Sequence, residues 1–506
     1  MDKNKLKIII LISIFVLACV LRLAYLDSRS LWGDEVDSVF VAFDFASHDY
    51  TFQRASLLKC LTFPVISSFQ DGSKMPLYFI LLGVWINIFG PASIGLRLLS
   101  VIFGILSIMA FYFFMSKYFK SNIAMLGTFL LAVSPMHILY SNDIRVYSLM
   151  VLLAVLSLWY LMKILNGEKN AINYAWYITW STLFVYVHYF SVLFLFAQIA
   201  VVAIASLKER SAKKYQGILF SQSLVFLMFA LWAVSGLLRF SRVLMGGEAL
   251  IPQATYNFIL RTASVVFALF FGESIAPWNP FVAVGMLALI ALFIRYMYSI
   301  KDMDNNVTVF SILFVVSIIS SMVLKNVLPN YLIPVLPVLM ALIAYSIFLF
   351  RSFAVKLVLV ILICVVCAVS ILNYYSLREI HNSNRIEPWK RIAGDLSQEM
   401  VRGDRIYVND WFVVFRELNY YLNVLSNKGQ KVRLMDEGLS GDRIFLVLHI
   451  HDEDQKDRIF STIRNAGYGI RLKSSYVPYS ETIASKLPRK HHKIDQSRVE
   501  VYVCTK

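Results

Sequence analysis

The sequence predicts a mainly α-helical protein that crosses a membrane many times and ends in a small α/β domain. Of its 506 residues, 58% are hydrophobic and 16% are charged, and the mean hydropathy is +0.65. Soluble domains of this size are far less apolar. Up to about residue 375 the apolar residues form runs of membrane-spanning length, and beyond it the charge rises. We therefore expect a polytopic fold of about 11 to 13 transmembrane helices, each of roughly 20 residues.

About eleven runs are long enough to cross roughly 30 Å of hydrocarbon. They are Ile8 to Leu26, Ser93 to Met115, Asn122 to Tyr140, Val146 to Leu165, Ile172 to Val187, Phe190 to Leu207, Gln216 to Leu238, Pro280 to Met297, Val307 to Leu324, Tyr331 to Phe350 and Ala354 to Tyr374. Two further apolar pieces are ambiguous. Met75 to Phe89 is short and contains a proline, whereas Tyr256 to Phe271 carries Arg261.

The distribution of basic residues decides how the ambiguous pieces are placed. If both stay on the outer side, every cytoplasmic turn carries lysine or arginine, as the positive-inside rule requires. These residues are Lys117, Lys120, Lys163, Lys169, Lys208, Arg210, Lys213, Lys214, Arg295, Lys301, Arg351 and Lys356. Both pieces then read as helices lying in or dipping into the outer interface. We expect a multi-pass protein of the inner (cytoplasmic) membrane.

The same topology places several polar segments on the outer face. They are Asp34 and Glu35, Lys74, Asn142 to Arg145, His188 and Tyr189, and Asn326 to Asn330. We expect a transmembrane domain over residues 1–376, with a first outer loop at 27–92 and a second large outer loop at 239–279. Residues 377–506 then form an extracytoplasmic domain.

Short β-rich runs alternate with helical patterns in this last domain. Strands are expected at Arg405 to Val408, Arg443 to Ile450, Tyr468 to Lys473 and Val499 to Cys504, and helices at Pro388 to Met400 and Asp454 to Ala466. Its length of about 130 residues suits a small α/β domain.

Several function classes are excluded by composition. The net charge of +16 does not indicate nucleic-acid binding, because the basic residues form short clusters and no continuous stripe. The five cysteines and eight histidines show no disulfide framework and no zinc-ligand spacing. The lysines before the first apolar run imitate a signal peptide, but that run continues to Leu26, so we expect an uncleaved anchor.

The acidic stretch after the first span is the strongest candidate for chemistry. Leu31 to Asp37 holds three carboxylates within four residues beside Trp32. Such charge is costly next to lipid unless it lies in an aqueous or protein-lined cleft. Asp34 and Glu35 are therefore candidate functional groups, and the alternative is that they cap the helix that begins near Val36. Adjacent helical residues point about 100° apart, so the two carboxylates are not expected to share one role.

Cationic residues on the same face are candidate phosphate ligands. Lys74 precedes the first interfacial helix and can hold a phosphate at headgroup depth, or can simply snorkel. Arg97 lies just inside its span, where a guanidinium requires a carboxylate or a phosphate. Asp143 and Arg145 join two spans and can equally form a solvated turn.

Aromatic and histidine side chains complete the set of candidates. Tyr147 begins the span after that turn, and His188, Tyr189 and Tyr331 lie at outer span ends. Aromatic belts occur at such positions in any case, so the sequence leaves both a binding role and an interfacial role open.

These segments, in their order, resemble the GT-C glycosyltransferases, in particular the bacterial branch similar to protein O-mannosyltransferases and to the aminoarabinose transferases that modify lipid A. The resemblance covers roughly residues 6 to 380. The residues that carry it are Arg22-Leu23, Trp32 to Glu35, Lys74 to Phe79, Gly95 to Ser100, Ser134-Pro135, Tyr140 to Tyr147, His188 to Phe190, and Asn330 to Pro334 with Pro337.

The resemblance implies a polyprenyl-phosphate sugar as donor, an active site in the first outer loop and an inverting transfer. Asp34 matches the catalytic aspartate, Asp143 the second acidic position and Lys74 a donor-phosphate contact. The sequence departs from the pattern at Lys74-Met75-Pro76, where relatives have His-Pro-Pro or Lys-Pro-Pro, and at Asn330, where many have arginine.

A sugar carried on a lipid phosphate already has a good leaving group, so the reaction needs one base and cations for the phosphate. We expect Asp34 to be that base, with Asp143 orienting it or the acceptor, and Lys74 with Arg97 or Arg145 stabilising the phosphate. Glu35, Tyr147, His188, Tyr189 and Tyr331 are expected to contact substrate.

The expected partners are the lipid-linked donor, an acceptor that is a cell-envelope glycan, lipid or protein, and the membrane lipids. No cofactor is expected. Acids at Asp34, Glu35 and Asp143 could hold Mg²⁺ or Mn²⁺, but the motif type argues against a metal. The alternatives are a transporter of lipid-linked sugars, which predicts inverted repeats and broken helices that the sequence does not show, and an outer-face scaffold built on the last domain.

Overall fold

Two units make up the chain in the computed structural model. The described residues are 3–24, 26–48, 50–72, 74–246, 258–323, 328–376, 388–401, 404–409, 414–425, 432–450, 453–476 and 498–506. The first unit comprises Met1–Ala24, Pro64–Leu81 and Arg97–Leu372. The second comprises Tyr25–Phe63, Leu82–Leu96 and Asn373–Lys506, so much of the first loop groups with the C-terminal domain.

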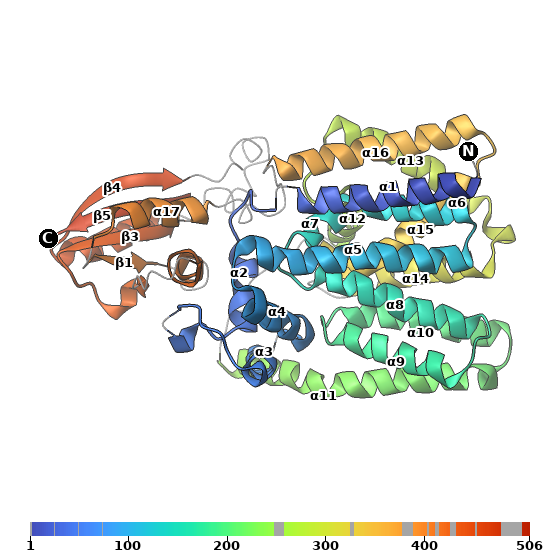
Figure 1. Cartoon of the computed structure of the whole chain (residues 1–506), viewed down its shortest axis with the longest axis horizontal. Helices are drawn as coiled ribbons and strands as arrows, with labels where there is room; N and C mark the ends of the chain where they lie inside the picture. The colour runs from blue at the N-terminus through green and yellow to red at the C-terminus, as the bar shows by residue number, and fades with distance from the viewer. Residues whose placement is uncertain are drawn as a thin grey trace. The chain divides into compact units, whose positions relative to one another are not determined.

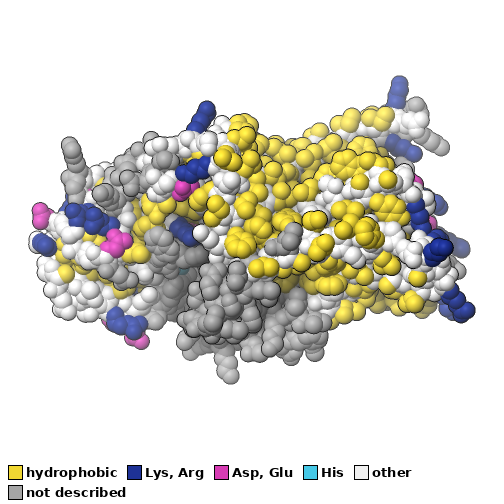
Figure 2. Space-filling view, turned by 90° about the horizontal axis from the view of Figure 1, so that it is seen from below, with side chains coloured by type: hydrophobic (Ala, Val, Ile, Leu, Met, Phe, Trp, Pro, Cys, Tyr) yellow, Lys and Arg dark blue, Asp and Glu magenta, His cyan; other side chains and the backbone are white. Residues whose placement is uncertain are grey.

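Apolar helices, most of them long, run side by side in the first unit (Figure 1). They are α1 (Lys3–Leu23), α5 (Ser93–Tyr118), α6 (Ser121–Ala132), α7 (Pro135–Ser141), α8 (Tyr147–Leu165), α9 (Ala171–Val185), α10 (Ser191–Lys208), α11 (Gln216–Gly246), α12 (Phe258–Phe271), α13 (Pro280–Met297), α14 (Asn305–Val323), α15 (Leu336–Phe348) and α16 (Phe353–Tyr375). Helices α3 (Leu57–Asp71) and α4 (Pro76–Phe89) contribute to both units. The surface of the long helices is largely apolar, as lipid contact requires (Figure 2).

The predicted polytopic membrane fold is confirmed, although the number of spans differs in detail. Within the described residues, nine helices are long and apolar enough to cross a membrane, or ten if α6 and α7 form one bent span. Helix α9, which was predicted as a complete span from Ile172 to Val187, has 15 residues and is therefore only about 22 Å long. The ambiguous pieces are the short helices α4 and α12, of 14 residues each.

The third predicted span is broken. The sequence reads as one run from Asn122 to Tyr140, but α6 and α7 meet at an angle of 56°. Pro135 begins α7 and lacks the N–H that a continuous helix would need, and the Ser134 hydroxyl accepts a hydrogen bond from the backbone of His137 at 3.5 Å. The sequence analysis found no broken helix and therefore missed this break.

A buried arginine spans this break. Arg22 of α1 is fully buried and donates hydrogen bonds to the carbonyl of Ala132, at the end of α6, and to Nδ1 of His137, at 3.0 and 2.7 Å. Since Nδ1 accepts, the proton of the neutral ring lies on Nε2, which is 3.0 Å from the Ser107 hydroxyl of α5. The network thus ties three helices to the start of α7.

The turns predicted to be cytoplasmic gather at one end of the first unit. Lys117 forms an ion pair with Glu168, Lys169 donates to the carbonyl of Lys214 at 2.6 Å, and Asn306 donates to the carbonyl of Tyr118 at 3.3 Å. The Arg295 guanidinium donates to the carbonyl of Leu349 at 3.0 Å. Lysine and arginine side chains are visible at this end of the helices in Figure 2. These contacts agree with the grouping that the positive-inside rule produced.

The second unit contains a five-stranded mixed sheet in the order β2-β1-β3-β5-β4. The strands are β1 (Arg405–Val408), β2 (Val432–Leu434), β3 (Arg443–Ile450), β4 (Gly469–Tyr476) and β5 (Arg498–Thr505). Strand β1 pairs in parallel with β2 and β3, whereas β5 pairs antiparallel with β3 and β4. Central strand β3 is buried along nearly its whole length, as its apolar run predicts.

Helices α17 (Trp389–Glu399), which is labelled in Figure 1, and α19 (Glu453–Asn465) complete the predicted α/β domain. Ile463 of α19 packs into a core with Tyr407, Leu446 and Tyr502 from three strands. The four predicted strands and two predicted helices are all present, with ends that differ by up to three residues. Strand β2 and the helical segment α18 (Arg416–Asn419) with η7 (Tyr420–Leu425) were not predicted.

The close approach of α5 and α7 generates a stability prediction. A Cβ added at Gly104 would stand 2.3 Å from the Ser141 hydroxyl oxygen and 2.9 Å from Ser141 Cβ. We expect Gly104→Ala to lower stability by about 1 to 3 kcal/mol, because both helices are already in contact. Thermal unfolding in detergent measures this.

The matched control is Gly95→Ala, since a Cβ there meets nothing within 4 Å. Equal melting temperatures for the two variants would show that α5 and α7 do not approach as closely as described.

Candidate functional site

The acidic helix α2 (Gly33–Ala42), in the second unit, presents its carboxylates in different environments. Glu35 is fully buried, and its Oε2 accepts a hydrogen bond from the backbone N–H of Trp32 at 3.3 Å. Glu35 therefore caps the helix, which is one of the two alternatives that the sequence left open. Asp37 is buried in an ion pair with Arg416. Asp34 is partly exposed, so it is the acid of this helix that a substrate can reach.

The loop that carries Lys74 lies between α3 and α4 in the first unit. Lys74 Nζ is 2.6 Å from Asp71 Oδ2, with both side chains about three-quarters or more buried. Trp232 of α11 donates to the carbonyl of Lys74, and the Tyr189 hydroxyl donates to the carbonyl of Gly72, each at 3.3 Å. The loop is thus held by side chains from α11 and from the segment between α9 and α10, and the lysine ammonium is held by one carboxylate.

The turn between α7 and α8 carries several of the predicted residues. Asp143 is fully buried there. The rings of Tyr140 and Tyr147 pack edge to face at 4.7 Å, and the Arg145 guanidinium stands 5.8 Å from the Tyr147 ring. The Tyr140 hydroxyl donates to Glu273 Oε1 at 2.9 Å. The two tyrosine side chains therefore pack beside this turn.

The later segments join the same cluster. Asn330 Nδ2 donates to the Tyr147 hydroxyl at 2.6 Å. The Tyr331 ring is 4.8 Å from the His188 ring and stacks on Phe190 at 4.5 Å. The structure thus brings together Tyr147, His188 and Tyr331, which lie far apart in the sequence.

His188 is held as a neutral ring. Its Nδ1 accepts a hydrogen bond from the backbone of Phe190 at 3.2 Å, so Nε2 carries the proton. Burial, together with the nearby Arg145 charge, lowers the pKa of His188 to about 3. The imidazole is therefore uncharged at neutral pH and can act as a hydrogen-bond donor.

Two acids in these clusters were missed by the sequence analysis. Asp71 ends an amphipathic helix, and Glu273 follows an apolar piece, so each reads as an ordinary helix-end residue. Asp71 is placed by its ion pair with Lys74, and Glu273 by its bond to Tyr140. The position of Asp71, three residues before Lys74, was the one available signal.

Of the remaining predicted residues, Arg97 is buried within α5, at 1% exposure. Arg97, Lys74, Asp143, Arg145, Tyr147, His188, Tyr189 and Tyr331 all belong to the first unit, whereas Asp34 and Glu35 belong to the second. No group of three or more His, Cys, Asp and Glu side chains in the described part of the chain has an arrangement suited to a metal ion.

An apolar groove of about 470 Å³ lies beside the Lys74 loop. It is lined by Tyr189, Phe190, Val192, Leu193, Phe196, Phe229 and Ser320. Because Tyr189 both lines the groove and bonds to Gly72, the groove adjoins the Asp71 and Lys74 pair. An apolar groove next to a cation suits an amphiphile with an anionic head.

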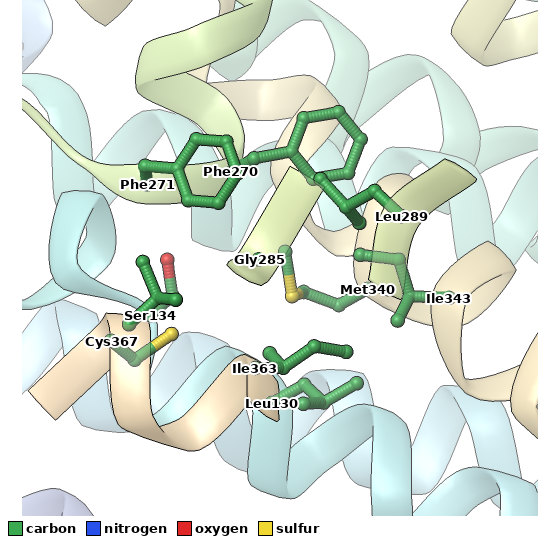
Figure 3. A pocket seen from close by; sticks show the side chains of 11 residues that line it. Leu130, Ser134, Phe270, Phe271, Gly285, Leu289, Met340, Ile343, Ile363 and Cys367 are labelled. Atoms are coloured by element: carbon green, nitrogen blue, oxygen red, sulfur yellow. The ribbon is translucent and has the colours of Figure 1, made fainter. Parts of the chain in front are cut away.

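A second cavity, near the break between α6 and α7, is too small for a sugar. Its volume is about 20 Å³, close to that of a single water position. Figure 3 shows Phe270 and Phe271 on one side, facing Ile363 and Cys367 on the other. We therefore interpret it as a packing defect between helices.

Comparisons with known proteins agree with this architecture. The family model described as dolichyl-phosphate-mannose-protein mannosyltransferase matches residues 73–234. The chain is similar to ArnT from Cupriavidus metallidurans bound to undecaprenyl phosphate, with a TM-score of 0.61, 14% identity, and 97% of both chains covered. The apo state of that protein gives a TM-score of 0.60, with the same identity and coverage.

A third similar structure is the apo Archaeoglobus fulgidus oligosaccharyltransferase, with a TM-score of 0.49 and 11% identity over 85% of this chain and 64% of that one. No curated protein matches by sequence. The chain is a polytopic membrane protein with the GT-C glycosyltransferase fold, organised as in ArnT. The resemblance seen in the sequence is confirmed at the level of the fold.

The lowered pKa of His188 generates a pH prediction. In the unfolded chain the His188 imidazole is protonated below about pH 6.5, whereas in the folded chain it stays neutral down to about pH 3. This contribution to stability is therefore present above pH 6.5 and is lost as the pH falls towards 3. When the pH is lowered from 7 to 5, the free energy of unfolding of the wild type should fall by roughly 1 to 2 kcal/mol more than that of His188→Gln.

Thermal unfolding at the two pH values measures the difference. Identical pH dependence in the wild type and the variant would mean that His188 titrates normally in the folded protein.

Proposed function

We propose that the protein is a glycosyltransferase that moves a single sugar from a polyprenyl-phosphate donor to a cell-envelope acceptor. The acceptor class is a glycolipid, a polysaccharide or a protein, and transfer occurs on the outer face of the cytoplasmic membrane. The GT-C fold supports this proposal, as does the undecaprenyl phosphate bound by the similar ArnT structure. The observation that carries it is that Asp34 is the partly exposed acid of α2, whereas Glu35 and Asp37 are buried.

Asp34 acts as general base in this reaction. It takes the proton of the acceptor hydroxyl as the oxygen attacks the anomeric carbon of the donor sugar. The bond between that carbon and the phosphate oxygen breaks, and polyprenyl phosphate leaves as an anion. Because attack and departure occur on opposite faces, the anomeric configuration inverts. No general acid is required, since the phosphate leaves without a proton.

Lys74 supplies the cation for the donor phosphate. In the structure its ammonium is paired with Asp71, so the phosphate must replace or share this carboxylate. The apolar groove that begins at Tyr189 suits the first isoprene units of the tail. Arg97 and Arg145 are the further candidates for the phosphate, and Asp143 and His188 for the sugar or acceptor hydroxyls.

The broken span calls for comparison with the transporter alternative, which predicts broken helices. Here Arg22 donates a hydrogen bond to the carbonyl at the end of α6, and α7, which follows the break, leads into the turn that carries Asp143. The break therefore serves to present polar groups at one end of the bundle. Chemical transfer of the sugar, rather than its movement across a bilayer, separates the two functions.

The base assignment predicts the effect of Asp34→Asn. A positioned base contributes about 10² to 10⁴ in rate, so the variant should lose visible product while remaining folded in the membrane. The measurement is incubation of purified protein with radiolabelled polyprenyl-phosphate sugars and envelope extract, followed by mass spectrometry of the glycans.

Asp44→Asn is the matched control, because Asp44 lies in the same loop but pairs with Lys59 at 3.0 Å. It should retain activity. Normal product from well-expressed Asp34→Asn would contradict the proposal, and release of donor across vesicles without transfer would favour a transporter.

The phosphate assignment predicts opposite effects at Lys74 and Asp71. Lys74→Ala should weaken binding of undecaprenyl phosphate by about 10-fold to 100-fold, since a charge-assisted contact is lost. Asp71→Asn should strengthen binding by up to roughly fivefold, because the competing carboxylate is removed. Tryptophan fluorescence or calorimetry with undecaprenyl phosphate in nanodiscs measures both.

Lys59→Ala, which breaks the ion pair with Asp44, provides the control and should leave the affinity unchanged. An unchanged affinity in Lys74→Ala would exclude this lysine from the phosphate site.

A further inference from the structure

One segment of the C-terminal domain packs directly on the acidic helix. Residues 414–425, which include α18 and the π-helical turn η7, contact α2 within the second unit. Arg416 NH1 donates to Asp37 Oδ1 in an ion pair whose carboxylate is only 5% exposed. Asp37 follows Asp34 by three residues and thus lies on the same side of the helix. The pair therefore fixes the rotation of α2 about its axis.

Contacts on both sides of α2 strengthen this attachment. The backbone N–H of Leu31, just before the helix, donates to the Tyr421 hydroxyl at 2.6 Å. After the helix, the Tyr50 ring meets the Phe415 ring edge to face at 5.6 Å. The same short segment thus holds the chain before, within and after α2.

The segment also reaches the residue next to Asp34. Glu417 is fully buried, and a Cβ placed on Gly33 would lie 3.7 Å from its Oε1. The glycine leaves room for α18 at the first turn of α2. A methyl group at position 33 would be in ordinary van der Waals contact with Glu417, so α18 lies directly against the first turn of α2.

Further anchors join the domain to the rest of the loop. Lys390 bonds to Ser30 through its backbone N–H, at 3.0 Å, and to Asp27 through its ammonium, at 2.8 Å. The Tyr420 hydroxyl donates to the carbonyl of Pro91 at 2.7 Å. A π-helical turn is rare and is found frequently at functional sites, which fits a segment shaped for one contact.

We propose that residues 414–425 are the positioning element of the acidic helix, with Arg416 as its principal positioning residue. The C-terminal domain then holds α2 so that the Asp34 carboxylate has a single orientation. This inference rests on the proposed role of Asp34 as base. Because a displacement of about 1 Å can cost roughly 10²-fold in rate, loss of the contact between Arg416 and Asp37 should lower turnover without removing a reacting group.

Amide hydrogen exchange of the full-length protein in nanodiscs tests directly whether residues 414–425 position α2. In Arg416→Ala, amides of α2 should exchange at least roughly tenfold faster, while those of strands β1 and β3 stay protected. Modification of envelope glycans by the variant in a gene-deleted host should fall about 10²-fold. Affinity for undecaprenyl phosphate should stay within twofold, because Lys74 is untouched.

Two comparisons separate positioning from general damage. Arg416→Lys keeps the charge and should recover much of the exchange protection and the activity. Removal of both charges, in Asp37→Asn with Arg416→Gln, should be less harmful than either single change, since neither charge is left buried without its counter-charge. Arg391→Ala is the control: this arginine of the same domain is exposed, its nitrogen lies 3.9 Å from Asp395, and it should behave as wild type.

Unchanged exchange of α2 in Arg416→Ala, or additive losses in the double variant, would overturn the inference. Faster exchange throughout the domain would also overturn it, because Arg416 would then be a general structural residue. If Asp34→Asn remains active while α2 exchange in Arg416→Ala responds as expected, the assignment of Asp34 as base is wrong and the positioning role of residues 414–425 is retained.

Discussion

The polar end of the first unit depends on the hydrogen bonds that the buried Arg22 guanidinium donates. A charged side chain inside an apolar helix bundle is costly, and removing its partners leaves that cost uncompensated. Here the charge is satisfied by the carbonyl that the break after Ala132 leaves open and by the neutral ring of His137. Helix α7 is thereby fixed in direction, and with it Tyr140 and the turn that holds Asp143.

From this fixed helix the polar cluster extends by direct contacts. Tyr140 holds Glu273, its neighbour Tyr147 binds Asn330, and Tyr331 packs against His188. These residues come from several different helix ends, so the cluster forms only when the bundle is assembled. The basic turns gather at the other ends of these helices, which separates a cation-rich end from an end rich in acids, amides and aromatic rings.

The acidic helix of the second unit depends on a different kind of support. Its three carboxylates are given three separate roles by their surroundings, because Glu35 caps the helix, Asp37 holds Arg416, and Asp34 keeps access to solvent. The sequence could predict that adjacent acids point in different directions. It could not predict which acid would pair with Arg416, because Arg416 lies 379 positions from Asp37.

Much of the fold follows from patterns that the sequence displays openly. Apolar runs identify the long helices, and β-rich stretches such as Arg443 to Ile450 identify the strands, because burial on both faces demands continuous apolar residues. Strand β2 was missed since three residues carry no detectable alternation. The segment around Tyr420 was missed because a π-helical turn lacks the 3.6-residue period. The site was less predictable than the fold, since the surroundings of Lys74 and Asp143 arise from contacts between distant segments. The break at Ser134-Pro135, for example, is bridged by Arg22, which lies 110 positions before Ala132.

Cysteine accessibility tests most directly whether the acidic loop and the polar turns face the extracytoplasmic side. Single cysteines would replace Gln53, Leu328, Lys169 and Lys213, which are all exposed, in a protein whose five native cysteines are changed to serine or alanine. A membrane-impermeant maleimide added to intact cells or spheroplasts should label Gln53→Cys and Leu328→Cys at once, and Lys169→Cys and Lys213→Cys only after permeabilisation. The reverse pattern, or labelling of Gln53→Cys and Leu328→Cys from opposite sides, would contradict this topology and the sugar transfer proposed from it.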